Sequence, residues 1–416
     1  MSDSDTHPQR RPAFVACRPW RPPSGPPLTR RQKFLPEIFW WVAGLTIALA
    51  VLPITAPADS TGQTANGADP RLASLDGFRA SAEHTPRRPR PQPAREPRRD
   101  SWSVAFDNDM LVPGSRDQDY TYGLSASYTG AGARDFWFSL DTPLRWLDRL
   151  AGLAARSNDG VESHTVEAGL FGFTPEDVEA TATHYDDRPY ASLIYLSQSR
   201  VQVDRVNRVA WHSSLTVGAL GLDLVGDAQN AVHKVTGSHH AEGWDDQISD
   251  GGEPTARYAI ARQKYLDVSS DNLEVKSTLQ GSLGYLTEAS WSLSFRGGRL
   301  RSPWWQSNPE LVSYGQGASQ NNRPTGTNEH YLWGGAAIVA RGYNAFLQGQ
   351  FRDSEVRYQF DELNHLVLEA WVGYTFEFQN GYRLSYVLRG HTSEVRDGAG
   401  DRNLLWGGVI VAKTFD

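Results

Sequence analysis

The chain has 416 residues, a formal net charge of −7 and a single cysteine, Cys17. The length allows one large domain or two to three smaller ones, and one cysteine excludes stabilisation by internal disulfides. The excess of acidic residues lies after residue 100, which argues against a nucleic-acid partner because phosphate binding requires clustered cations.

The first 58 residues have the pattern of a secretory signal peptide with a long n-region. An apolar run over residues 38–52 follows a Pro- and Arg-rich segment, and Ala56-Pro57-Ala58 supplies small residues for cleavage before Asp59. An uncleaved inner-membrane anchor is the alternative. Residues 59–99 have no hydrophobic periodicity, and their Pro- and Arg-rich composition is typical of a disordered linker.

From residue 101 onwards, apolar and polar residues alternate with a period of two. In residues 366–378, every second residue from Leu366 to Phe378 is apolar or aromatic, and these residues share one face. Glu369 and Glu377 lie on the other face. No stretch of this region has the ~18 consecutive apolar residues of a membrane helix. An apolar face opposite a charged one is typical of a transmembrane β-barrel, although a soluble β-sandwich is the alternative.

The same alternation predicts twelve strands. They lie near residues 101–109, 119–130, 163–174, 189–203, 206–221, 255–269, 274–286, 290–300, 330–348, 366–379, 382–391 and 403–415. An even number returns both ends of the chain to the periplasm, as bacterial barrels usually do. We therefore predict that residues 100–416 form an all-β, antiparallel transmembrane barrel of the bacterial outer membrane, with a short helix in an outer loop.

The parity of the strands predicts which connections are extracellular. These are expected near residues 110–118, 175–188, 222–254, 287–289, 353–365 and 392–402. The long stretches 131–162 and 301–329 then fall on the periplasmic side, where turns are normally short. Residues 143–150, in the first of these stretches, have the pattern of a small amphipathic helix.

The first predicted hairpin carries an acidic tip. Asp107, Asn108 and Asp109 end one strand, and Asp117 and Asp119 begin the next, with Thr121 on its polar face. A solvated loop would also look like this. Strict alternation places Asp107 and Asp109 inward but Asn108 outward, so either the strand bulges there or Asn108 acts from beyond the sheet. Carboxylates at this density are suited to a hard divalent cation, so we predict a metal site with Asp109 and Asp107 as ligands.

The loop over residues 222–254 is the richest in candidate catalytic groups. Asp227 is placed to cap a helix over residues 228–236, which carries His233 with Gln229 one turn earlier on the same side. A neutral histidine is a suitable general base near pH 7. A surface or structural role for His233 is the alternative.

Arg188 lies where an outer loop enters the fourth predicted strand, within Asp186-Asp-Arg-Pro-Tyr-Ala191. Its guanidinium is suited to binding a substrate phosphate. A structural ion pair is the alternative.

Taken together, these motifs resemble those of the outer-membrane lipid A 3′-O-deacylases of the LpxR type. The resemblance covers about residues 101–416 and rests on short motifs in a shared order. They are Asn108-Asp109, Asp117 with Tyr120-Thr121-x-Gly123, Asp187-Arg-Pro-Tyr-Ala191, Gln229 with His233, and Gly243-Trp-Asp-x-Gln247 followed by Glu253-Pro254.

The resemblance implies a twelve-stranded barrel that hydrolyses an ester-linked acyloxyacyl group of lipid A at the outer rim and depends on calcium. It implies that His233 matches the general base, and that Asn108, Asp109 and Thr121 match other active-site positions. The sequence departs from the family member compared in two places. A carboxylate six residues after the catalytic His is replaced by His239, so Asp245, Asp246 or Glu253 would have to substitute. An active-site Lys is also absent from residues 175–188.

Two other functions remain open from the sequence. One is a phospholipase-type acyl hydrolase with a Ser nucleophile, for which His212-Ser213-Ser214 is the one suggestive cluster. The other is a non-enzymatic barrel, such as a small pore. Under the preferred interpretation, the partners are lipid A or lipopolysaccharide and the outer membrane, and the protein is expected to be a monomer.

Overall fold

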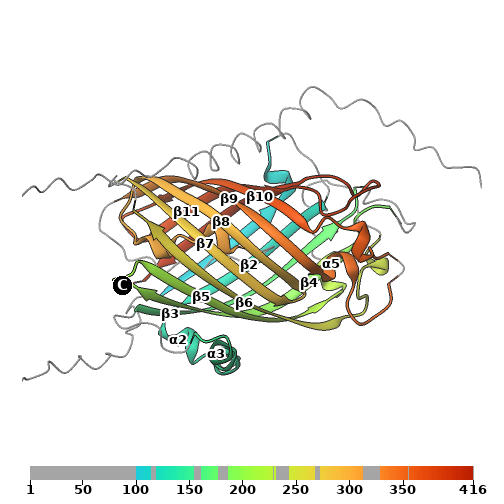
Figure 1. The fold of residues 1–416 in the computed structure, drawn as a ribbon, viewed down its shortest axis with the longest axis horizontal. Coiled ribbons are helices and arrows are strands. Elements are labelled where there is room, and N and C mark those ends of the chain that lie inside the picture. Colours follow the sequence, from blue (N-terminus) through green and yellow to red (C-terminus); the bar gives the residue numbers. More distant parts are fainter. Residues whose placement is uncertain are drawn as a thin grey trace, which may run out of the picture.

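Twelve antiparallel strands close into a barrel, in which consecutive strands pair and β1 pairs with β12 (Figure 1). The structure is a computed structural model that describes residues 100–113, 119–153, 161–176, 186–227, 229–230, 243–267, 272–312, 328–354 and 356–415. The all-β barrel and the number of strands predicted from the alternation are confirmed. The predicted signal peptide (1–58) and the whole of the linker (59–99) lie outside the described residues.

The strand bounds follow the predicted ones closely. They are β1 (Ser101–Asn108), β2 (Asp119–Thr129), β3 (Val161–Thr174), β4 (Ala191–Asp204), β5 (Val209–Leu220), β6 (Glu253–Leu266), β7 (Leu273–Gly284), β8 (Leu286–Arg299), β9 (Glu329–Asn344), β10 (Leu366–Glu377), β11 (Tyr382–His391) and β12 (Leu404–Thr414).

The alternation separates a lipid-facing surface from a polar interior. Leu283 and Leu366 on the outer surface are 68% and 63% exposed. In the interior, Arg389 and Glu369 form an ion pair at 2.5 Å. This distribution is the one expected for a barrel with lipid outside and polar side chains inside. Among the described residues, no helix is long and apolar enough to cross a bilayer.

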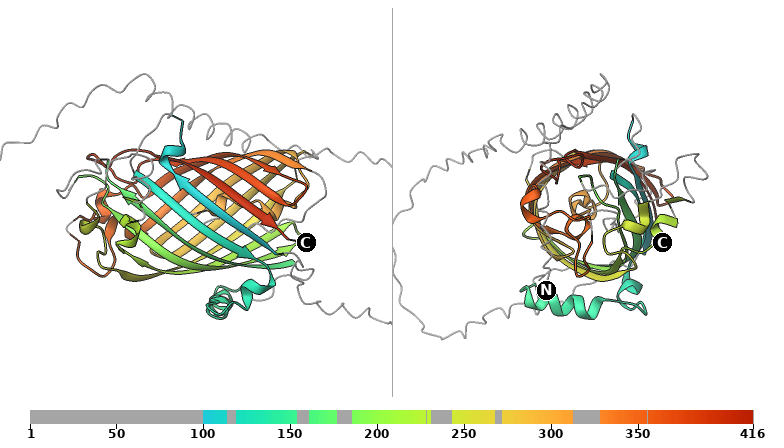
Figure 2. Two further views of the ribbon diagram at one scale, coloured as in Figure 1. Left: turned by 180° about the vertical axis from the view of Figure 1, so that it is seen from behind. Right: turned by 90° about the vertical axis from the view of Figure 1, so that its right-hand side faces the viewer.

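The interior is filled at both ends. At the outer end, α5 (Ala345–Gln348) places Phe346 in an aromatic cluster, 5.3 Å from the ring of Phe171 between centroids. At the periplasmic end, η4 (Pro309–Leu311) enters the barrel, where Glu310 pairs with Lys276 at 2.8 Å. The view along the barrel axis in Figure 2 shows chain segments inside the ring of strands.

Two predicted boundaries at the outer end are wrong. Strand β9 ends at Asn344 rather than at residue 348, because the Asn344 side chain accepts a hydrogen bond from Phe346 N and caps α5. The predicted connection 287–289 is instead a tight turn at Tyr285, so β8 begins at Leu286. Gly284, with φ of +134°, adopts a backbone conformation at this turn that other residues rarely adopt.

The two long periplasmic stretches leave the strands in opposite directions. The first forms α2 (Ala131–Arg134) and α3 (Asp141–Leu150), which lie outside the ring of strands (Figures 1 and 2). The amphipathic helix predicted over 143–150 is thus confirmed. The second forms η3 (Trp304–Gln306) and η4, which fold back into the barrel.

Candidate functional site

Asn108 ends β1 on the outer surface of the barrel wall. The pairing of β1 with β2 and β12 runs without interruption, so Asn108 shares the lipid-facing side of Val104 and Phe106. The sequence left open whether the strand bulges here or Asn108 acts from beyond the sheet. The uninterrupted register excludes a bulge in β1 and places Asn108 on the membrane side of the wall.

Asp107 lies on the other side of the wall. Its carboxylate occupies the space beside Gly408 that a side chain at that position would fill, and Val387 of the interior cluster also borders that space. The prediction of Asp109 and Asp107 as the ligands of one metal ion stays a prediction. Asp107 faces the interior and does not lie with Asn108, because neighbouring residues of a strand point to opposite faces.

Thr121 is turned towards Asn108 by a β-bulge in β2. The register with β3 shifts between Tyr120 and Tyr122, so Tyr120 packs in the interior against Phe173 and Tyr122 lies on the outer surface. Strict alternation would have placed Thr121 inside. Instead, the Asn108 side-chain amide donates a hydrogen bond to the Thr121 carbonyl oxygen.

The hydroxyl of Thr121 has a partner on the neighbouring strand. Its Oγ1 lies 2.7 Å from Oγ1 of Thr174, and both threonines are about 1% exposed. Thr174 is not recognisable as a site residue in the sequence, because its role depends on a cross-strand contact with a residue 53 positions away. Asn108, Thr121 and Thr174 form a polar group on the outer surface at the outer rim, which we call the rim group.

A short 3-10 turn holds Asn108 in place. Its Oδ1 accepts a hydrogen bond of 2.6 Å from Met110 N and caps η1 (Asp109–Leu111). Leu111 then lies against Gly407 of β12, and its carbonyl accepts a 2.6 Å hydrogen bond from the Tyr386 hydroxyl. Asp109 is the first residue of this turn, and only 1% of its surface is exposed.

The loop between β5 and β6 folds outward and covers the wall beside the rim group. Residues 224–227 and 229–230 are helical, and Val225 packs with Trp244 against Tyr122. Trp244 Nε1 donates a 2.7 Å hydrogen bond to Gln229 Oε1. The short outer-loop helix is confirmed, but it begins by Leu224 rather than after Asp227, because apolar residues one turn earlier pack against the wall.

Contact between this loop and the wall depends on glycines. A Cβ at Gly172 would lie 2.9 Å from Trp244 Cη2 and 3.1 Å from Val225 Cγ1. A Cβ at Gly226 would lie 2.6 Å from Trp244 Cγ. The absence of side chains at these two positions lets the indole ring lie flush against the barrel, on the same surface as the rim group.

Several predicted site residues lie outside the described part of the chain. These are His233, Asp117 and His239. Among the acids considered as substitutes at position 239, Asp245 and Asp246 are exposed in η2 (Gly243–Asp246). The Glu253 carboxylate instead binds another loop, because its Oε1 accepts hydrogen bonds from Phe351 N and Arg352 N.

Arg188 is buried inside the barrel near the outer end. It is 1% exposed, its guanidinium lies 5.0 Å from the ring centre of Phe173, and its Nη2 is 2.7 Å from Glu394 Oε2. Burial alone would raise the pKa of the Glu394 carboxyl, but the charges of Arg341 and Arg188 outweigh it and hold that pKa well below its usual range. This position favours the structural ion pair over contact with a substrate.

The described oxygen atoms at the rim are of the kind that a hard cation prefers. Asp109 supplies a carboxylate, and Asn108 and Thr121 supply carbonyl or hydroxyl oxygens in the same short region. Within the described ranges, however, no group of three or more His, Cys, Asp or Glu residues is arranged to hold a metal. These oxygens are of a kind that suits calcium, but the described residues do not form a complete set of ligands, so calcium binding by Asp109 stays a prediction.

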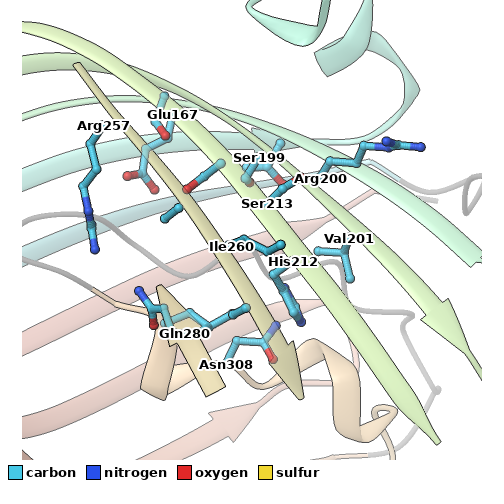
Figure 3. A pocket seen from close by; sticks show the side chains of 16 residues that line it. Glu167, Ser199, Arg200, Val201, His212, Ser213, Arg257, Ile260, Gln280 and Asn308 are labelled. Carbon is cyan, nitrogen blue, oxygen red and sulfur yellow. The ribbon is translucent and has the colours of Figure 1, made fainter. Parts of the chain in front are cut away.

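The Ser-nucleophile alternative has its cluster in the wrong arrangement. His212 faces an interior cavity of about 80 Å3 (Figure 3). Its Nε2 lies 2.7 Å from Gln263 Oε1. Ser213 points to the outer surface, where its hydroxyl donates to Asp148 at 3.0 Å. His212 and Ser213 thus act on opposite sides of the wall, and neither lies at the outer rim.

A family model described as "Outer membrane protein LpxR" matches residues 78–415. The chain belongs to the LpxR family. Both the family resemblance and the outer-membrane location expected from the sequence are thereby confirmed. Comparison with curated proteins gives no match.

Solved structures support the fold of this LpxR-family chain. LpxR from Salmonella typhimurium matches with a TM-score of 0.57 at 16% identity, covering 76% of this chain and 100% of that one. This likeness shows a shared barrel fold. The KdgM porin matches with a TM-score of 0.33 at 6% identity, covering 76% and 99% of the two chains, which is too weak a likeness to support an argument.

Proposed function

We propose that the protein is an outer-membrane esterase that removes an ester-linked acyloxyacyl chain from lipid A. Membership of the LpxR family gives the general class of lipid A deacylase. The observation that carries the proposal is the position of the rim group on the membrane side of the wall, beside the loop that contains Val225 and Trp244. Lipid A occupies the outer leaflet, so its ester bonds reach this surface by lateral diffusion.

The filled interior argues against a pore. Aromatic rings including Phe171 and Phe346 pack across the outer end, and Glu310 and Lys276 pair at the periplasmic end. A pore would require a continuous polar path between these ends. An enzyme that binds its substrate on the outer surface requires no such path.

In the proposed reaction, His233 accepts a proton from a water molecule whose oxygen attacks the acyl carbon. The bond between that carbon and the sugar oxygen then breaks, and the proton passes to the sugar oxygen, giving a free fatty acid and a sugar hydroxyl. Asn108 and Thr121 orient the ester from the wall. Bound calcium, held by Asp109, would supply positive charge that stabilises the developing oxyanion.

A single chain suffices for this function. The pairing of β1 with β12 closes the sheet within one chain and leaves no unpaired strand edge among the barrel strands. We therefore propose a monomer that acts on lipopolysaccharide in the membrane in which it resides.

Two threonine pairs between the same strands provide a matched test. Thr121 pairs with Thr174 at the rim, and Thr129 pairs with Thr165 at the periplasmic end, each at 2.7 Å between Oγ1 atoms. Thr121→Val and Thr129→Val therefore remove the same kind of hydrogen bond at different places. We expect mass spectrometry of lipid A from cells expressing each variant to show loss of deacylation for Thr121→Val only.

The proposal fails if Thr121→Val deacylates lipid A as fast as Thr129→Val does. It also fails if a phosphonate reagent traps a covalent acyl-enzyme analogue on a serine, because direct attack by water forms no such adduct. Both variants are checked for the heat-modifiable migration of a folded barrel.

A further inference from the structure

The outer surface of β3–β5 is unusually polar in its periplasmic half. Glu162, His164 and Arg200 lie on the outward-facing side of their strands. Thr165, next to His164, and Ser199 and Val201, on either side of Arg200, line the interior cavity instead. Figure 3 shows the Arg200 side chain directed away from the cavity residues Gln280 and Asn308. Charged residues on this face would meet lipid if the wall were bare.

Helix α3 covers this polar surface. The Asp148 carboxylate accepts hydrogen bonds from Arg200 Nη1 at 3.1 Å, Ser213 Oγ at 3.0 Å and the Tyr258 hydroxyl at 3.0 Å. Two helical turns away from this contact, Asp141 lies 3.4 Å from His164 Nε2. The side of α3 that faces the barrel carries these two acids together with the buried Leu144, and the acids neutralise cationic or donor groups of the wall.

The opposite side of the same segment is apolar and uncovered. Trp146 and Leu150 on α3 are 58% and 68% exposed, and Trp137 and Phe138 just before it are 78% and 52% exposed. An amphipathic helix usually turns its apolar side towards the protein, whereas Trp146 and Leu150 face away from it here. A segment surrounded by water would not be expected to expose two tryptophans, a phenylalanine and a leucine within 14 residues.

We propose that residues 131–150 form an interfacial anchor whose aromatic side inserts into the phospholipid of the periplasmic leaflet. The segment follows the periplasmic end of β2 and lies beside the lipid-facing wall (Figure 2). Tryptophan and leucine on one side of a short helix are typical of insertion at the boundary between headgroups and acyl chains. On this side of the barrel, the lipid boundary runs over α3 instead of over β3–β5.

The anchor can be tested with single-cysteine variants, because Cys17 is the only cysteine of the chain. In a Cys17→Ser background, nitroxide labels are placed at Trp146→Cys and Leu150→Cys. Leu279→Cys on the lipid-facing side of β7 is the membrane control, and Val206→Cys in the periplasmic turn after β4 is the aqueous control. The proteins are folded into phosphatidylcholine–phosphatidylglycerol vesicles and checked for heat-modifiable migration.

We expect the labels at positions 146 and 150 to behave like the label at 279. They should relax readily with oxygen, which concentrates in lipid, and lose the accessibility to a water-soluble nickel reagent that the label at 206 retains. Nickel accessibility equal to that at 206 would overturn the proposal. Protection from both reagents with spin–spin broadening would also overturn it, since a second copy of the chain would then cover the helix.

Discussion

Gly172→Val is the substitution that most directly tests whether the loop over the wall is needed for activity. Gly172 lies on the outer surface beside the rim group, and a Cβ there would approach Trp244 Cη2 to 2.9 Å and Val225 Cγ1 to 3.1 Å. Favourable carbon contacts lie at about 3.5–4.0 Å, so the loop must move away. Overpacking of this kind typically costs about 1–3 kcal/mol, which lowers the equilibrium constant for docking of the loop about 5- to 150-fold.

The assay is release of fatty acid from lipid A by purified protein in mixed micelles, with Gly281→Val as the matched control. Gly281 also faces lipid, on β7, and the nearest atom to a Cβ there is 4.0 Å away, so valine fits without strain. We expect the activity of Gly172→Val to fall at least about 5-fold. Both variants should remain heat-modifiable. Parent activity in a folded Gly172→Val protein would refute the role given to the loop.

Three further outcomes are expected. His233→Ala should leave a folded barrel whose deacylation rate is about 10²–10⁴-fold lower, and the ascending limb of the pH–rate profile near an unperturbed histidine pKa of about 6.5 should vanish; an unchanged profile would exclude His233 as the base. Excess chelator should abolish activity, and added calcium should restore the activity of the parent protein. Calcium should not restore activity to Asp109→Ala. Full activity in chelator would exclude a metal. Because the pKa of Glu394 is lowered in the folded state, its contribution to stability is complete above its usual pKa of 4.5 and disappears as the pH falls towards the lowered value. Glu394→Gln should therefore lower the Tm at pH 7, where breaking a buried pair costs about 3–5 kcal/mol, and the difference from the parent should narrow below pH 4.5; a pH-independent difference would refute this.

The period-two alternation was sufficient to predict the barrel, because the contrast between lipid and a polar interior imposes it on every strand. It could not predict how connections leave the strands. Residues 345–348 continue the apolar pattern of β9, yet they form α5, since Phe346 fills the outer end of the barrel. Tertiary contacts also decide whether each long periplasmic stretch packs outside or inside the barrel. Asp148 binds the outer surface of the wall, and Glu310 binds Lys276 in the interior.

At the candidate site, the sequence identified residues better than it identified their surroundings. Alternation correctly placed Asn108 outward and Asp107 inward, which already separated these neighbours. The bulge in β2 has no local signal, so the outward position of Thr121 and its contact with Thr174 could not be predicted. The sequence also could not show that the wall beside the site is covered by Trp244, which depends on the glycine at position 172.

One residue of the rim group, Asn108, lies at the seam where the first and last strands meet. Asn108 pairs with Gly407 of β12, and Leu111 of η1 rests against that same glycine. β12 is the last strand to be synthesised, so a chain that has not yet closed has nothing to hold η1 or to orient Asn108. If the proposed function holds, the chain has no esterase activity while it crosses the periplasm, and it does not hydrolyse phospholipids there. The active site would thus form only when the barrel closes, in the membrane that contains its substrate.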